Sequence, residues 1–132
     1  MITNSSNVMN IMSKSLDAYW LRNDAITHNV ANVDTPNYKR QEVRFEELLK
    51  EQMNDMKDVS EGRMPASRLK SISDIKPELY EQEPNMKYRL DGNNVDIDNE
   101  MAEIAKNTMR YNVVTSQLNK QFAAMRTAMN KQ

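Results

Sequence analysis

Residues 97–129, IDNEMAEIAKNTMRYNVVTSQLNKQFAAMRTAM, carry the most regular pattern in this chain of 132 residues. Apolar or near-apolar side chains recur there at alternating spacings of four and three residues, which is typical of a helix with a coiled-coil seam. The members of the pattern are Ile97, Met101, Ile104, Thr108, Tyr111, Thr115, Leu118, Phe122, Met125 and Met129. We therefore predict one continuous helix over the whole stretch.

The order of charges along residues 96–132 supports this helix. All the acids precede all the bases, so each sign lies at the helix end where it opposes the macrodipole. Asp96 or Asp98 is the expected N-cap. At about 1.5 Å per residue the helix would be roughly 50 Å long, and a compact body of this size cannot cover that length. Its seam must therefore meet another long helix.

A second helix with the same kind of seam is predicted near the amino end. Its positions are Met9, Met12, Leu16, Tyr19, Asn23, Ile26, Val30 and Val33. We place this helix at about residues 5–32, with Ser5 or Ser6 as its cap and Pro36 setting its end. We expect the two long helices to lie antiparallel or staggered, with their seams facing each other at a shallow angle.

Residues 38–95 form a connector that holds most of the charged residues, three of the four prolines and both glycines. Apolar positions within it predict a short amphipathic helix, and they are Val43, Phe45, Leu48, Leu49, Met53 and Met56. Residues 88–97 alternate around a central Asp-Gly, which predicts a β-turn or a strand pair. No sustained period runs through residues 59–86.

The predicted fold class is therefore mainly α, with two long terminal helices packed as a coiled-coil-like pair. A short, charged and partly irregular connector joins them. We divide the chain into residues 1–35 for the amino-terminal helix, 36–95 for the helix exit and connector, and 96–132 for the carboxy-terminal helix. A monomeric bundle that uses the connector as a third element is the alternative arrangement.

Composition excludes several kinds of chemistry. The chain has no cysteine, a single histidine and two widely separated glycines, so it cannot form a disulfide, a thiol nucleophile, a cysteine zinc site or a glycine-rich phosphate loop. His28 is expected on the surface or at the edge of the seam. The candidate acid–base carboxylates are Glu46, Glu47 and Glu51, and interleaved bases indicate a solvated helix face instead. Residues 91–100 lack the spacing of a calcium loop. We predict no enzyme activity, cofactor, metal or small-molecule substrate.

Charge and hydropathy argue against nucleic-acid binding and against a membrane-spanning segment. The 18 basic and 19 acidic residues are mixed along the chain, so no basic patch for nucleic acid emerges. No apolar run approaches the roughly 20 residues that span a bilayer, and residues 1–13 lack the basic and apolar segments of a cleavable signal. Eleven methionines accompany few large aliphatic residues, which indicates a chain that completes its core with neighbours.

The segment between the first helix and the connector, residues 29–38, has the sequence NVANVDTPNY. Its Asn and Asp side chains can satisfy backbone groups locally, and Pro36 fixes one φ angle. Asn37 tolerates a left-handed conformation, so Tyr38 can fold back on the helix. The segment is predicted to be a structured helix exit, and an ordinary helix stop is the simpler alternative.

At this segment the chain resembles the rod and hook proteins of the bacterial flagellum. Their amino-terminal helix ends in a pattern close to Ser-Asn-Ile-Ala-Asn-x-x-Thr-Pro-Gly-Tyr. The family motif in this chain comprises Asn29, Val30, Ala31, Asn32, Thr35, Pro36, Asn37 and Tyr38. His28 stands at the usual serine position and Asn37 at the usual glycine.

The length of the chain restricts the resemblance to the small members of the family, because 132 residues leave room only for the helices and a short connector. Residues 45–49 (FEELL) and 91–98 (DGNNVDID) are similar to the small proximal-rod members of the family. The resemblance implies a non-enzymatic structural subunit of the proximal rod of the basal body. It implies synthesis in the cytoplasm and export through the flagellar type III apparatus without a cleaved signal. The implied partners are copies of the chain, other rod proteins, the basal-body ring and the export gate.

The resemblance also implies that the helix seams are used for self-assembly. We define the assembly seam as Met9, Met12, Leu16, Tyr19, Ile26, Val30, Ile97, Met101, Ile104, Tyr111, Leu118, Phe122, Met125 and Met129. The alternative function is a cytoplasmic helical adaptor or export chaperone that holds a partner helix on the same seam.

Overall fold

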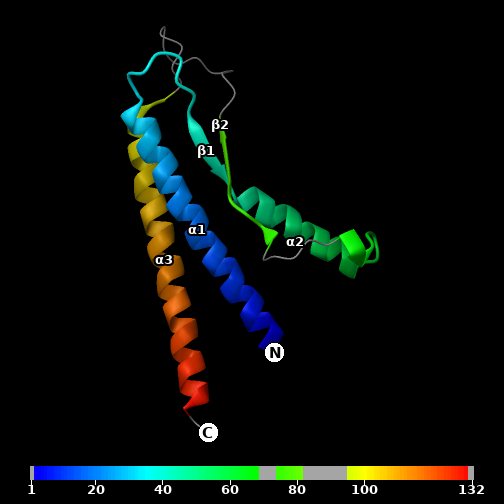
Figure 1. Cartoon of the computed structure of the whole chain (residues 1–132). Coiled ribbons are helices and arrows are strands. Elements are labelled where there is room, and N and C mark those ends of the chain that lie inside the picture. Colours follow the sequence, from blue (N-terminus) through cyan, green and yellow to red (C-terminus); the bar gives the residue numbers. More distant parts are fainter. Residues whose placement is uncertain (1, 69–73, 82–94, 131–132) are drawn as a thin grey trace.

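The computed structural model describes residues 2–68, 74–81 and 95–130. In chain order these form helix α1 (Ile2–Ala31), strand β1 (Gln41–Arg44), helix α2 (Glu46–Ser60), a single 3-10 turn (Ala66–Arg68), strand β2 (Glu78–Glu81) and helix α3 (Ile97–Met129). Figure 1 shows α1 and α3 running antiparallel, with both chain ends at the same end of the molecule. The prediction of a mainly helical chain with two long terminal helices in contact is confirmed.

The first residues of the two long helices agree with the sequence prediction for α3 but not for α1. Asp96 is the N-cap of α3, and its Oδ1 accepts a hydrogen bond of 3.0 Å from the backbone N–H of Asp98, as predicted. Helix α1 begins at Ile2, so the prediction that Ser5 or Ser6 caps it is wrong, because the backbone at both residues is already helical.

Helix α1 ends at Ala31, close to the predicted residue 32. The proline does not end it directly, because Pro36 lies five residues beyond the last helical residue. Instead, the Asn32 side chain donates to the carbonyl of His28 at 2.9 Å and occupies a carbonyl of the last turn. A side chain of the motif therefore finishes the helix before the proline is reached.

The connector contains a small antiparallel sheet that the sequence pattern missed. Strands β1 and β2 pair from Gln41 opposite Glu81 to Arg44 opposite Glu78. The sequence pattern places Val43 in the short amphipathic helix, but it lies in β1 with its side chain buried, and α2 begins only at Glu46. The β-turn or strand pair predicted for residues 88–97 lies largely outside the described residues.

The apolar core of the described residues is small and lies where α2 leaves the rest of the molecule. Ala18, Phe45 and Ile75 are buried against one another, and Leu48 and Leu49 pack on them. From this point α2 projects away from the α1–α3 pair (Figure 1). The core therefore fixes only the first turn or two of α2 to α1.

Contact between α1 and α3 is concentrated near the helix exit, and the two helices separate toward the chain ends (Figure 1). Within the assembly seam, Ile26 is buried. The half-buried members are Met9, Met12, Leu16, Tyr19, Val30, Ile104 and Leu118. The exposed members are Ile97, Met101, Tyr111, Phe122, Met125 and Met129. Much of the seam on α3 is thus uncovered in the single chain.

Candidate functional site

The helix exit is a series of tight turns that continues directly from α1. The N–H of Thr35 donates to the carbonyl of Asn32 at 3.0 Å, and the N–H of Tyr38 donates to the carbonyl of Thr35 at 3.3 Å. Asn37 has a φ of 59°, which confirms the left-handed conformation predicted for it. The chain is thereby turned back alongside α1.

Asn29 is the centre of the site, and its side chain is completely buried. Its Nδ2 donates to the Gln41 carbonyl at 2.9 Å and to Glu100 Oε2 at 3.0 Å. Its Oδ1 accepts from the Gln41 N–H at 2.8 Å and from the Tyr38 hydroxyl at 3.2 Å. An amide side chain has two donor hydrogens and two acceptor lone pairs, so Asn29 uses all its hydrogen-bonding capacity. The prediction that Tyr38 folds back on the helix is confirmed.

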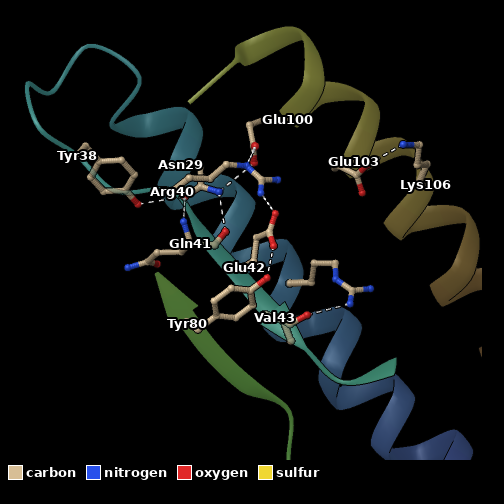
Figure 2. A network of polar contacts seen from close by, with 11 residues as sticks. Asn29, Tyr38, Arg40, Gln41, Glu42, Val43, Tyr80, Glu100, Glu103 and Lys106 are labelled. Atoms are coloured by element: carbon tan, nitrogen blue, oxygen red, sulfur yellow. Dashed lines mark hydrogen bonds and ion pairs between the residues drawn. The ribbon is translucent and has the colours of Figure 1, made fainter. Parts of the chain in front are cut away.

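Glu100 brings α3 into the same network (Figure 2). Its side chain is fully buried, and Arg40 Nε donates to its Oε1 at 2.5 Å. Arg40 is itself buried and also contacts Glu42, whose second oxygen accepts from the Tyr80 hydroxyl. A buried carboxylate is tolerated only when it is paired and hydrogen-bonded. The Arg40 guanidinium and the Asn29 amide supply both conditions.

The exit network, defined as Asn29, Tyr38, Arg40, Gln41, Glu42, Tyr80 and Glu100, therefore joins four elements through side chains. Figure 2 shows these groups converging between the end of α1, the start of β1, strand β2 and the first turn of α3. Burial raises the pKa of the Tyr38 hydroxyl, and the charges of Glu81 and Glu100 raise it further. The hydroxyl is thus kept protonated as a donor to Asn29.

A second ion-pair group lies farther along α1 and anchors α2. Arg22 makes a two-pronged contact with Glu46, at 2.8 Å from Nη1 to Oε1 and 2.5 Å from Nη2 to Oε2. Its Nη2 also donates to the Val43 carbonyl at 3.2 Å, and Arg110 of α3 lies 3.6 Å from Glu46. We call Arg22, Glu46 and Arg110 the α2 anchor.

The two central groups of the anchor favour each other's charged forms. Burial acts to raise the pKa of Glu46, but the Arg22 hydrogen bond and charge, a backbone hydrogen bond and the Arg110 charge outweigh it and lower the pKa below its ordinary value. The hydrogen bond to Glu46 raises the pKa of Arg22, against a smaller lowering by burial. Glu46 is therefore ionised at neutral pH.

A buried amide also lies between α1 and α3. Asn107 is 4% exposed, and its Nδ2 donates to the backbone carbonyl of Tyr19 at 2.8 Å. Its Oδ1 has no hydrogen-bond partner among the described residues. This contact fixes the height of α3 relative to α1 midway along the pair.

The structure gathers only part of the family motif into the site. Asn29 and Tyr38 lie in the exit network, and Asn32 with Thr35 shapes the turn through a hydrogen bond of 3.1 Å. Pro36 and Asn37 are exposed, as are Ala31 and His28. Val30 is half-buried. His28 lies 3.9 Å from Asp24 on the helix surface.

Sequence reasoning missed Arg40 and Glu100, which are the charged centre of the site. The charge pattern places Glu100 among the acids that favour the start of α3, a surface role that predicts no burial. The one signal in the sequence is that Glu100 and Asn107 are seven residues apart and so share a helix face. A search for apolar periodicity passes over such polar positions.

Among the described residues there is no group of three or more potential metal ligands. In that part of the chain, no helix is long and apolar enough to cross a membrane. The polar side chains of the exit network bond to one another, so the arrangement holds elements in place.

The structure has two long helices that are joined at the helix exit and carry exposed apolar side chains. These features are those of a helical structural protein. No family model matches the chain. Individual relatives do match, and they include flagellar basal body rod proteins FlgB from three bacteria. The protein of Borreliella burgdorferi is 36% identical over 109 residues, covering 76% of this chain and 79% of its own length. That of Bacillus subtilis is 29% identical over 109 residues, with 83% and 82% covered. That of Proteus mirabilis is 26% identical over 137 residues, with 99% of both chains covered.

The chain belongs to the family of flagellar basal body rod proteins FlgB. The resemblance found at the helix exit is thereby confirmed, and it extends over most of the chain. This is a structural family and not a family of enzymes. Membership favours the structural interpretation over an adaptor or an export chaperone.

Proposed function

We propose that this chain is a building block of the proximal rod and that its assembly seam is covered by the terminal helices of neighbouring subunits. The observation that carries the proposal is the exposure of large apolar side chains along α3. Phe122 is 48% exposed, Met125 42% and Met129 67%. Apolar surface of this extent on one helix marks a surface that binds another protein.

The separation of α1 and α3 toward the chain ends explains why this surface is uncovered. Near the exit the helices are tied together by Asn29 and Glu100, and midway by Asn107. Beyond the half-buried Leu118, the seam residues Phe122, Met125 and Met129 are exposed. Helices supplied by neighbours would bury the seam at roughly 25 cal/mol per Å² of apolar surface.

The exit network has a separate role in this proposal. Because it joins α1, β1 and α3 through buried and part-buried bonds, it holds the two helices at one angle in every subunit. Repeated assembly requires such constancy, since identical contacts must be made by each copy. The family motif therefore acts by shaping the subunit, whereas the assembly seam makes the contacts.

The proposed partners are copies of the chain, other rod proteins, the basal-body ring and the export gate. We place the working location in the rod of the basal body, reached from the cytoplasm by type III export without a cleaved signal. The small core supports this route, because few buried apolar contacts oppose unfolding before passage. Nucleic acid and small-molecule substrates have no place in this function.

The proposal is tested by placing a charge on the exposed seam. Phe122→Asp should leave the helix content and stability of the isolated chain nearly unchanged, because Phe122 is exposed there. The same variant should abolish swimming and be absent from isolated basal bodies, because a carboxylate buried between helices is strongly unfavourable. Leu118→Asp should also abolish swimming and be absent from isolated basal bodies.

Gln117→Asp is the matched control, since it adds the same charge at an exposed polar position of α3 outside the seam. It should be incorporated and support swimming. Motile cells that carry Phe122→Asp in their rods would refute the proposed role of the seam.

A further inference from the structure

The only tryptophan of the chain lies on the surface, away from the assembly seam. Trp20, in the middle of α1, is 68% exposed. Asp17 and Asp24, three residues before and four residues after it, lie on the same helix face and are not buried. We call these three residues the Trp20 surface. Tryptophan is enriched at the energetic centres of protein interfaces, and a largely exposed ring gains little from the fold.

A second apolar surface outside the seam lies on α3. Met109 is 61% exposed and Val113 is 68% exposed, and their spacing of four places them side by side. Lys106 and Arg110 flank them, and each keeps 53% of its side chain exposed while contacting Glu103 and Glu46 of the same chain. We call Lys106, Met109, Arg110 and Val113 the Met109 surface. No acidic residue occurs in residues 104–132.

The two surfaces lie on different helices and do not face each other. On α1 the buried Ala18 is two positions from Trp20, and on α3 the buried Asn107 is two positions from Met109. Two positions correspond to about 200° around a helix. Trp20 therefore points away from the core that Ala18 forms with Phe45 and Ile75, and Met109 points away from α1, which Asn107 contacts. The two surfaces cannot meet within one chain.

The two surfaces lie at similar heights along the pair. The hydrogen bond of 2.8 Å from Asn107 Nδ2 to the Tyr19 carbonyl places residue 107 beside residue 19. Because the helices are antiparallel, Trp20 and Met109 lie on opposite sides of this level, one and two residues from it, and they differ in height by about 4.5 Å. A neighbouring copy shifted by about this distance along the helices would bring Trp20 to the height of Met109.

We propose that the Trp20 surface of one copy docks on the Met109 surface of the next copy. This inference rests on the proposed function and adds a contact between copies that is distinct from the assembly seam. The occupant is a second copy because the charges match, with two carboxylates beside Trp20 and two bases beside Met109 and Val113. Because the contact joins two different surfaces that cannot meet within one chain, it is head-to-tail and does not close as a symmetric pair.

The absence of cysteine from the chain gives a direct test. The double variant Trp20→Cys/Met109→Cys is expressed in place of the wild-type chain, basal bodies are isolated, and the thiols are oxidised with copper phenanthroline. A disulfide requires Cα atoms about 4.4–6.8 Å apart, and residue 109 faces away from α1 within one chain. Crosslinks therefore form only between copies, and we expect a ladder of dimers and higher multimers on a non-reducing gel.

The control is Trp20→Cys/Ala124→Cys, in which the second cysteine is also exposed on α3. Ala124 lies fifteen residues beyond Met109, about 22 Å along the helix, and should give no ladder. If the double variant is incorporated but gives no ladder, or if the control gives an equal ladder, the inference is overturned and the proposed function is unaffected. Absence of even the wild-type chain from basal bodies overturns the proposed function instead.

A second measurement needs no variant, because Trp20 is the only source of tryptophan fluorescence. Concentrated purified chain is compared with dilute chain for emission wavelength and for quenching by acrylamide. We expect a shift of emission to shorter wavelength and a loss of quenching as copies cover Trp20. Unchanged quenching in the concentrated chain overturns the inference, even where the cysteine variant fails to assemble.

Discussion

The Asn29 amide uses both of its donors and both of its acceptors in hydrogen bonds to three different parts of the chain. Two of these bonds go to the backbone of Gln41, so the amide takes the place of a neighbouring strand at the start of β1. A third reaches Glu100 of α3. One residue of the motif thus positions both the sheet and the second long helix.

Removing the Asn29 amide should lower the stability of the folded chain. Asn29→Ala removes the amide partner of Glu100 Oε2, of the Tyr38 hydroxyl and of the Gln41 backbone at a buried or part-buried place, so the free energy of unfolding should fall by about 3 kcal/mol. Urea unfolding followed by circular dichroism measures the change. The control Asn23→Ala, at an exposed position of α1, should change stability by less than about 0.5 kcal/mol. Equal effects of the two substitutions would contradict the central role of Asn29.

Arg40 and Glu100 should be strongly coupled because both are buried. Arg40→Met leaves the Glu100 carboxylate buried without its cation, which should cost about 3–5 kcal/mol. Adding Glu100→Gln removes the uncompensated charge, so the double variant should be more stable than Arg40→Met alone. A double-mutant cycle in urea measures this coupling.

The control for this cycle is Lys106→Met, which breaks the 2.6 Å surface pair with Glu103. An exposed pair contributes about 0–1 kcal/mol, so the loss should be small. If Glu100→Gln did not recover stability in the Arg40→Met background, the ion pair would not be the link between α3 and the exit.

At the scale of single residues, the sequence predicted the backbone of the exit better than its bonds. The tolerance of asparagine for positive φ and the return of Tyr38 follow from local chemistry, and both are present. The pairing of Arg40 with Glu100 spans sixty positions in sequence. No local rule connects residues so far apart, because their proximity depends on the packing of α3 against α1.

At the scale of elements, the long helices were predictable because their apolar period persists over many turns. The four-residue strands were not, since so short a segment cannot establish a period of two. Val43 and Phe45 fit equally well at the start of an amphipathic helix, and the pairing of β1 with β2 decides otherwise. Strand β2 is exposed along its whole length, which leaves no alternation to detect.

The attachment of α2 should depend on pH through Glu46. Its pKa is lowered in the folded chain from an ordinary 4.5, so its contribution is present above about pH 4.5 and is lost as the pH falls through the folded value. Because the side chain is 46% exposed, the contribution should be less than about 1 kcal/mol. Glu46→Gln should therefore be less stable than the wild type at neutral pH, and the gap should narrow at about pH 3.

Urea unfolding at the two pH values measures this gap. In an Arg22→Met background, Glu46→Gln should lose most of its effect, because the main partner of the carboxylate is gone. A gap that stays constant or widens in acid would show that Glu46 is not stabilised by the α2 anchor.

At the scale of the whole molecule, the sequence indicated two facing seams, and the structure shows a pair that is tied at one end. The exit network and Asn107 hold α1 and α3 by polar bonds, while several apolar seam positions of α3 remain exposed. Periodicity identifies which residues share a helix face, but it contains no information on how far two helices stay together. That depends on the exit geometry, which is set by buried polar groups.

This arrangement predicts a gradient of local stability along α3. Amides near Glu100 and Asn107 lie beside α1 and the network, so their exchange with deuterium should be slow. Amides beyond Leu118 belong to turns whose side chains are largely exposed. Short stretches of helix without tertiary cover are marginal in water, so these amides should exchange much faster in the isolated chain. Mass spectrometry of peptides from α3 after deuterium labelling measures the gradient. Uniform protection along α3 would mean that the isolated chain already covers its seam, and neighbours would then not be needed to stabilise it.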